Sequence, residues 1–148
     1  MKLTLVLAIL SCLSLHARSQ QAAWDICMDG RKLLSGAEGK KTDTIDLSAP
    51  KISSRRHLEV SYREAPSNIP WKYGLRISSP AGEPLLEKNF GKGDQPYRLP
   101  INEILKLPGK HAYLLLHLEQ HPADPEMDIR SKQVLLAVLN MKSKAHVP

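Results

Sequence analysis

The chain has 148 residues, a formal net charge of +6 and an aromatic content of 5%. This length is enough for one ordinary domain and too short for two. The basic residues are dispersed, and their tightest clusters are the pairs Arg31-Lys32, Lys40-Lys41 and Arg55-Arg56. A nucleic-acid-binding protein would concentrate its basic residues in a stripe, usually with aromatic residues for stacking. We therefore expect no nucleic-acid partner.

The first residues resemble a secretory signal peptide. A positively charged residue precedes the apolar run of residues 3–15, which is shorter than the stretch of about 20 residues that a transmembrane helix needs. Ala17 and Ser19 then place small residues at positions −3 and −1 before Gln20, a pattern typical of a cleavage site. The sequence therefore predicts two segments: a signal peptide at residues 1–19, and a single exported domain, secreted or periplasmic and without a transmembrane helix, at residues 20–148.

An alternative lies within the same apolar run. Residues 9–12, with the sequence ILSC, are similar to a bacterial lipobox, in which the cysteine becomes the lipid-bearing N-terminus. That family prefers leucine at −3, a smaller residue at −2 and polar residues after the cysteine, whereas Leu13 and Leu15 continue the apolar run here. A lipid anchor on Cys12 therefore stays as the alternative to a soluble exported domain.

The rest of the chain has the pattern of short strands separated by turns. Apolar and polar residues mostly alternate, so that each strand would turn one face to the core and one to water. Asp29-Gly30 predicts a two-residue hairpin, because such turns need positive φ angles. Only residues 101–107, between two prolines, have helical spacing, and one or two turns is the limit there. We expect strands at residues 24–28, 31–35, 44–48, 57–63, 71–78, 85–90, 112–118 and 134–139.

Two of these runs, residues 112–118 and 134–139, are apolar on both faces. Such runs are typical of central strands that are covered on both sides. About seven to nine short strands, almost no helix and no internal repeat together predict an all-β fold, an antiparallel β-sandwich.

Residues 107–109, with the sequence LPG, precede Tyr113 at the head of a long apolar run. This arrangement resembles the tyrosine corner of immunoglobulin-like and fibronectin-type sandwiches, in which the tyrosine hydroxyl ties the incoming loop to the strand. The usual spacing has two residues between Pro-Gly and Tyr, and this chain has three. The resemblance implies an immunoglobulin-like β-sandwich. The segments WDICMDGRKLL and DPEMDIRSKQVLLAVLN are also similar to small secreted bacterial proteins of uncharacterised function, which implies no activity.

Residues 117–121, with the sequence HLEQH, are candidate metal ligands. On a strand, His117, Glu119 and His121 would point to the same side, as a strand-borne metal site requires. Residues four apart on a strand lie about 13 Å apart at Cα, so both histidines on one straight strand would strain to reach one ion. A third ligand would have to come from another strand, for example His57. We interpret the row as a polar strand face followed by a turn, with a metal site as the alternative, and we expect no cofactor.

An EF-hand calcium loop is excluded. Asp124, Glu126 and Asp128 match its first ligands, but Ile129 stands where it needs glycine and Leu135 where it needs glutamate.

Catalytic signatures are missing from the sequence. There is no strand–nucleophile–helix elbow and no long helix to build one. Cleavage before Gln20 leaves Cys27 as the one cysteine, so that no disulfide can form within the mature chain. We interpret Cys27 as a buried thiol rather than an interchain disulfide, and neighbouring Asp25 and Asp29 would dull its nucleophilicity.

The sequence therefore predicts a protein that is not an enzyme. Our first hypothesis is a protein–protein or cell-envelope-surface interaction module, which would show an exposed apolar patch or an unpaired edge strand. The second hypothesis is metal or small-ligand binding through His117, Glu119 and His121. The third is a hydrolase on a β scaffold, which needs a pocket with a nucleophile in hydrogen-bond reach of a histidine.

Overall fold

The computed structural model describes residues 21–48, 56–91, 93–107 and 111–142. The predicted signal peptide, the lipobox cysteine Cys12 and the Pro108-Gly109 part of the tyrosine corner lie outside these residues. Within them, no helix has the length and the apolar character to cross a membrane.

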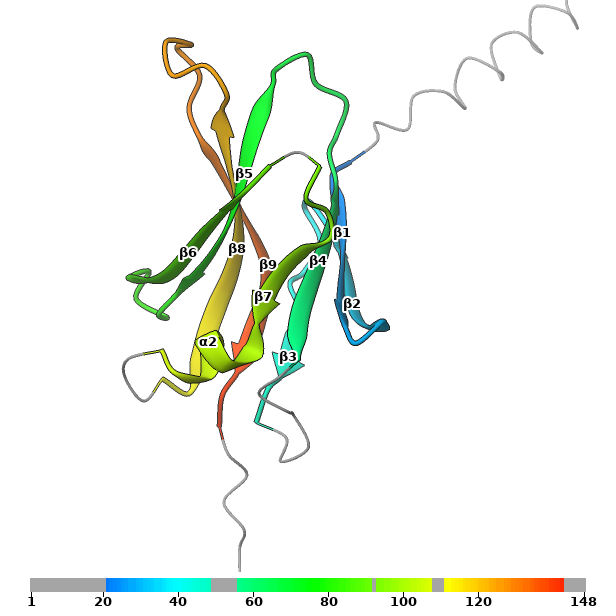
Figure 1. The fold of residues 1–148 in the computed structure, drawn as a ribbon, viewed down its shortest axis with the longest axis vertical. Helices are drawn as coiled ribbons and strands as arrows, with labels where there is room; N and C mark the ends of the chain where they lie inside the picture. The colour runs from blue at the N-terminus through cyan, green and yellow to red at the C-terminus, as the bar shows by residue number, and fades with distance from the viewer. Residues whose placement is uncertain (1–20, 49–55, 92, 108–110, 143–148) are drawn as a thin grey trace, which may run out of the picture.

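The described part of the chain forms nine strands in two sheets and one short helix (Figure 1). The four-stranded sheet has the order β2-β1-β4-β7, from Arg31–Ala37, Ala23–Met28, His57–Arg63 and Tyr97–Pro100. The five-stranded sheet has the order β3-β9-β8-β5-β6, from Thr44–Asp46, Lys132–Asn140, Tyr113–Pro122, Trp71–Ser78 and Pro84–Phe90. All neighbours are antiparallel except β3 and β9, which are parallel. The prediction of an all-β fold is confirmed.

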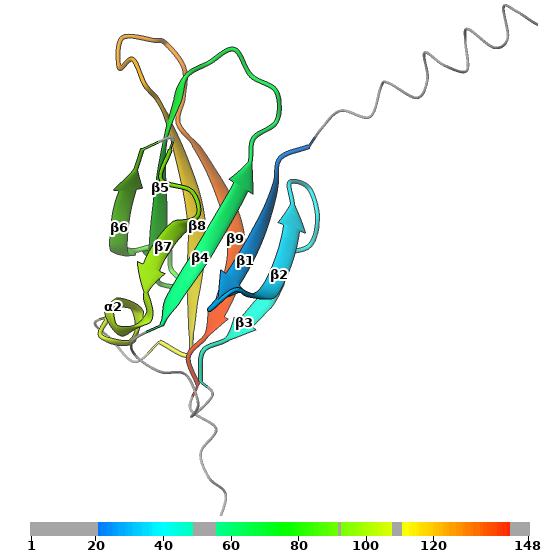
Figure 2. The same ribbon diagram turned by 45° about the vertical axis from the view of Figure 1, so that its right-hand side comes forward.

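The two sheets lie as two layers with the core between them (Figure 2). Alternation decides which side chains face inward: on β4, Leu58, Val60 and Tyr62 are buried while the residues between them are not. The indole of Trp24, on β1, reaches across the core and donates a hydrogen bond to the backbone oxygen of Leu136, on β9, at 3.1 Å. This bond ties the two sheets together because each partner belongs to a different layer.

The local turn chemistry follows the sequence. Asp29 and Gly30 have φ angles of 51° and 74°, as the predicted two-residue hairpin between β1 and β2 requires. The helix α2, Ile101–Leu105, is the predicted short helical segment. Cys27 is a free, partly buried thiol on β1.

The two runs that are apolar on both faces form β8 and β9, which are interior strands of their sheet, as predicted. The second layer covers only one side of β8, where Leu114, Leu116 and Leu118 are buried. Leu115 lies on the outer side opposite Val138, and both are partly exposed. The prediction that both faces are covered is therefore wrong for these described strands. Apolar side chains on the outer side instead shield one another in cross-strand pairs.

Tyr113 is the first residue of β8. It is 41% exposed, and the Nζ atom of Lys142 lies 5.2 Å from the centroid of its ring.

Candidate functional site

The three predicted metal ligands share the outer side of β8, as the alternation required. Glu119 is held by Arg76, whose Nη1 lies 2.7 Å from Glu119 Oε1. His121 Nδ1 lies 2.7 Å from Ser131 Oγ, and its Nε2 lies 3.5 Å from Glu119 Oε2. His57 lies on the exposed side of β4 in the other sheet, so it cannot complete this row. Within the described ranges, no group of three or more His, Cys, Asp or Glu side chains is placed to hold a metal ion.

The first histidine of the row, His117, is paired with a serine. His117 Nε2 lies 3.1 Å from Ser78 Oγ on the neighbouring strand β5. Burial lowers the pKa of His117, the positive charge of Arg76 lowers it further, and Glu119 opposes this in part. A neutral imidazole can accept the Ser78 hydroxyl proton in a hydrogen bond. Ser78 is 2% exposed and lines neither of the two hollows described below, and this pair gives its buried hydroxyl a hydrogen-bond partner.

The edge strands are poor templates for adding a strand from another protein. β3 has three residues, and β7 has four and ends in Pro100. β6 turns Lys88 to its inner side, opposite buried Leu75, and β2 pairs with β1 through an irregular register after Ile26. Short edges, inward charges, proline and bulges are the features that block edge-to-edge pairing. An unpaired edge strand is therefore a weak candidate for the binding site.

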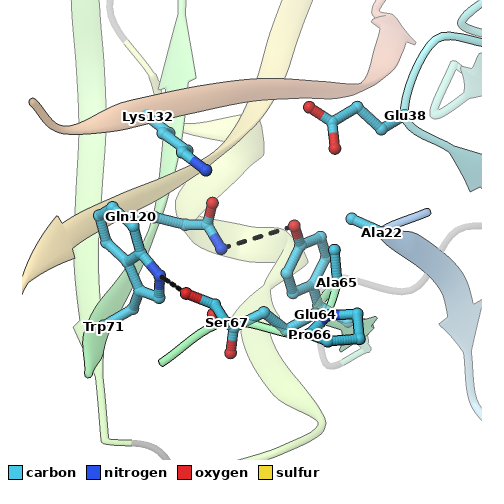
Figure 3. Close-up of a pocket in the computed structure, with 10 residues that line it drawn as sticks. Ala22, Glu38, Glu64, Ala65, Pro66, Ser67, Trp71, Gln120 and Lys132 are labelled. Carbon is cyan, nitrogen blue, oxygen red and sulfur yellow. Dashed lines mark hydrogen bonds between the residues drawn. The ribbon is translucent and has the colours of Figure 1, made fainter. Parts of the chain in front are cut away.

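A polar cavity lies at one end of the two layers, beside the connection from β4 to β5 (Figure 3). Its volume is about 130 Å³. The polar residues that line it come from both sheets and from that connection: Glu38, Tyr62, Glu64, Ser67, Trp71, Gln120 and Lys132. Ala22, Ala65 and Pro66 complete the wall.

The cavity has a buried polar floor. Gln120, Tyr62 and Trp71 are 4%, 5% and 6% exposed. Gln120 Nε2 donates a hydrogen bond to Tyr62 Oη at 3.5 Å, and Trp71 Nε1 donates to Ser67 Oγ at 3.4 Å (Figure 3). Gln120 takes the core-facing place that follows Leu118 on β8. A polar side chain in that place costs free energy unless its groups find partners, so it is the least expected residue of the core.

The rim of the cavity carries opposite charges on opposite sides. Lys132, on β9, holds its ammonium group 5.2 Å from the centroid of the Trp71 ring. Glu38 follows β2 of the four-stranded sheet, and Glu64 lies in the β4–β5 connection, where its Oε2 accepts a hydrogen bond of 2.5 Å from Tyr73 Oη on β5. Among the ion pairs of the described residues, none joins Lys132 to either glutamate.

The two carboxylates make the floor of the cavity electronegative. Burial raises the pKa of Tyr62 to about 12, and the charges of Glu38 and Glu64 contribute. Burial and the hydrogen bond to Glu64 also raise the pKa of Tyr73. Both hydroxyls therefore stay protonated at neutral pH and remain hydrogen-bond donors.

A second hollow, of about 420 Å³, lies at the end of β6. Its lining includes Lys72, Asn89, Phe90 and His121, so one predicted ligand does face a hollow. Its polar residues are all on β5, β6 and β8 of one sheet, whereas the smaller cavity combines charged, amide, hydroxyl and indole groups from both sheets. Ligand sites are usually recognised by such convergent polar groups.

Sequence reasoning missed the cavity, because its residues come from segments that are distant along the chain. The signal that could have found it is Gln120, which interrupts the apolar alternation of β8 on the core side. Comparison with protein families, with characterised proteins and with solved structures finds no match for this chain. The function must therefore be argued from the chemistry of the site itself.

Proposed function

We propose that this chain is an exported, non-catalytic binding module with an immunoglobulin-like β-sandwich fold, and that the cavity at the end of its two layers is the binding site. One observation carries the proposal: the cavity has a buried polar floor, and the charges at its rim are not paired with each other. Glu38, Glu64 and Lys132 are exposed, and an ion pair between exposed side chains contributes little, so these groups are available to a ligand. A site that keeps them apart is complementary to a ligand that brings its own polar groups.

Export and the finer fold type rest on the sequence. Residues 1–19 resemble a signal peptide, with the lipid anchor on Cys12 as the alternative. The two-layer all-β arrangement and the place of Tyr113 at the head of β8 support the immunoglobulin-like interpretation. In sandwiches of this type the loops at the two ends commonly carry the binding surface. The β4–β5 connection supplies one wall of the cavity in this way.

Binding fits the cavity better than catalysis does. A catalytic site needs a nucleophile or a general base whose pKa suits the reaction. The raised pKa of Tyr62 makes its hydroxyl a poor base at neutral pH. The hydroxyl of Ser67 accepts a hydrogen bond from Trp71, and no histidine or cysteine lines this cavity. The groups present can orient a ligand without reacting with it.

The indole N–H of Trp71 provides a direct test, because the chain has only one other tryptophan. Trp24 is buried in the core and bonded to Leu136, so its N–H resonance serves as an internal control. We expect a panel of small amines, carboxylates, amino acids and sugars to contain compounds that shift the Trp71 resonance and leave that of Trp24 in place. If no class in the panel shifts Trp71 at millimolar concentration, the cavity is not the binding site.

Metal binding through the outer row of β8 is the second candidate. The closeness of His121 Nε2 to Glu119 Oε2, 3.5 Å, favours it. A metal would have to displace Arg76 from Glu119, which opposes it. Calorimetric titration with zinc decides the matter: stoichiometric heat that disappears in a His121→Ala variant would support a metal site, and absence of heat would remove it.

A further inference from the structure

We infer that the cavity at the end of the two layers binds a small zwitterion, a molecule with one ammonium group and one carboxylate group. This inference rests on the proposed function, because it names the ligand of the same cavity. It follows from the separation of charge at the rim, from the amide at the floor and from the volume.

The two sides of the cavity attract opposite charges. Glu38, which follows β2, lines the side of the cavity opposite Lys132. Glu64, in the β4–β5 connection, also lines the cavity, and Tyr73 on β5 hydrogen-bonds to only its Oε2 atom. An ammonium group near these carboxylates would gain charge-assisted hydrogen bonds. On the opposite side, Lys132 is held over the Trp71 ring, where a carboxylate would meet its ammonium group. Figure 3 shows Lys132 and Glu38 on opposite sides of the space.

The floor between the two sides offers both a donor and an acceptor. Gln120 is 4% exposed, and its amide group lies near the end of the Lys132 side chain (Figure 3). Its nitrogen donates to Tyr62, and no hydrogen bond among the described residues uses its side-chain oxygen. Gln120 lines the cavity, so a ligand there can reach this amide group. A buried amide of this kind fixes the orientation of a ligand that carries a donor.

A ligand with a single charge satisfies the cavity less well. A simple cation would pair with Glu38 and Glu64 but would lie beside the like charge of Lys132 within the same small volume. A simple anion would pair with Lys132 and meet two carboxylates. The volume of about 130 Å³ limits the ligand further, because drug-sized molecules fill about 300–1,000 Å³. A zwitterion of a few heavy atoms fits the separated charges at the rim, the amide at the floor and the volume.

The test uses the full mature chain and a series of three zwitterions: glycine, β-alanine and 4-aminobutyrate. They differ only in the number of carbon atoms between the two charged groups, so their relative affinities measure the charge spacing that the cavity accepts. Butylamine and butyrate each lack one charged group of 4-aminobutyrate. We expect at least one zwitterion to bind by calorimetry and to shift the Trp71 resonance. We expect butylamine and butyrate to bind at least tenfold more weakly than that zwitterion, because each loses one set of charge-assisted hydrogen bonds.

Two rim variants assign the two ends of the ligand. Lys132→Gln should weaken the zwitterion about tenfold without weakening butylamine. Glu38→Gln should weaken the zwitterion and leave the binding of butyrate unchanged or stronger. Both residues are exposed, so the fold should tolerate the changes. Lys142→Gln is the matched control, because Lys142 also lies 5.2 Å from an aromatic ring, that of Tyr113, and does not line the cavity.

The outcomes separate this inference from the proposed function. If a sugar, an amine or a carboxylate shifts Trp71 while the three zwitterions do not, the zwitterion is wrong and the binding module stands. If the zwitterions bind but Lys132→Gln and Lys142→Gln weaken them equally, the assignment of the carboxylate end to Lys132 is overturned. If nothing in the panel shifts Trp71, both proposals fail.

Discussion

The outer side of β8 and the cavity at the end of the two layers use similar residues to opposite effect. On the outer side, charged and polar groups pair with one another: Arg76 with Glu119, His117 with Ser78, and His121 with Ser131. At the rim of the cavity, the ammonium of Lys132 and the carboxylates of Glu38 and Glu64 are not ion-paired with one another within the described part of the chain. Both regions carry carboxylates and cationic side chains, but these form an ion pair only on the outer side of β8.

This difference supports the cavity, rather than the outer row of β8, as the proposed binding site. A ligand that enters the outer row has to replace hydrogen bonds that already exist, so it gains only the difference between old and new contacts. At the cavity, Lys132 and Glu38 form no ion pair within the described part of the chain, so a ligand there mainly displaces water from them. Charge without an ion-pair partner at a concave site therefore favours binding more than a row of potential ligands along one strand does.

The largest effect is expected from a change that damages the frame of both regions. Gly36, on β2, lies opposite Trp24, and a β-carbon at Gly36 would overlap the indole ring of Trp24. Gly36→Ala should therefore push Trp24 away from Leu136 and cost about 3 kcal/mol in the free energy of unfolding, at the upper end of the usual cost of overpacking. Denaturant unfolding measures this loss.

Gly93→Ala provides the control for that substitution. No heavy atom lies within 4 Å of a β-carbon at Gly93, so the free energy of unfolding should change by less than about 0.5 kcal/mol. Equal stability of the Gly36 and Gly93 variants would mean that the contact between Trp24 and β2 does not position the two layers.

Alkaline pH should affect the cavity next. Because the pKa of Tyr62 is about 12 in the folded chain, against 10.0 for an unperturbed tyrosine, the unfolded chain loses this proton first as pH rises. The contribution of Tyr62 to the free energy of unfolding should therefore be constant below pH 10 and fall between pH 10 and 12, by at most about 2.7 kcal/mol at 1.36 kcal/mol per pKa unit.

Tyr62→Phe isolates that contribution. The variant cannot ionise at this position, so the fall in stability between pH 10 and 12 should be shallower than in the unmodified chain. Part of the fall should remain, because the pKa of Tyr73 is raised as well. Identical alkaline unfolding curves for the two proteins would contradict the raised pKa of Tyr62.

The sequence predicted the frame of the molecule better than its site. Alternation of apolar and polar residues is a local signal, and it placed β4 and β5 and put His117, Glu119 and His121 on one side of β8. The signal for the turn at Asp29-Gly30 is equally local, because the turn requires positive φ angles at these two residues alone. Neither signal reports which strands become neighbours. Ser78 and Arg76 contact His117 and Glu119 because β5 pairs with β8. That pairing is a property of the whole sheet.

The cavity could not be predicted for the same reason. Lys132 and Trp71 come from two strands of one sheet, and Tyr62 from the facing sheet, so that only the stacking of the layers brings them together. The apolar runs of β8 and β9 were misinterpreted as covered on both sides, because Leu115 on the outer side resembles a core residue in a single sequence. Leu115 is apolar because it packs against Val138 on the neighbouring strand, and not because a further layer covers it.

The outer row offers a smaller and more local effect. Glu119→Gln removes the ion pair between Glu119, whose side chain is 16% exposed, and Arg76, whose side chain is 25% exposed. Arg76 still has a second ion pair, with Glu87 at 3.2 Å. The free energy of unfolding should fall by about 1 kcal/mol, at the upper end for a partly exposed pair. Binding of the zwitterion series should not change, because Glu119 does not line the cavity. Thermal and denaturant unfolding measure the first effect, and calorimetry the second.

Glu59→Gln is the matched control on the other sheet. Its partner Arg98 is 63% exposed, so losing that pair should cost less than about 0.5 kcal/mol. A larger loss from Glu59→Gln than from Glu119→Gln would contradict the view that the outer row of β8 is a structural network.

The smallest expected effect concerns the protonation of His117. Its pKa is lowered in the folded chain by burial and by Arg76, so the unfolded chain takes up a proton first as pH falls below 6.5. The contribution of His117 to stability is therefore complete above pH 6.5 and is lost as pH falls through the folded pKa. His117→Gln should flatten this part of the stability curve, whereas Ser78→Ala removes the hydrogen bond and keeps the titrating group, so its curve should keep the slope. If both variants flatten the curve equally, the slope comes from the Ser78 contact rather than from the buried imidazole, and the outer row would be held by hydrogen bonding alone.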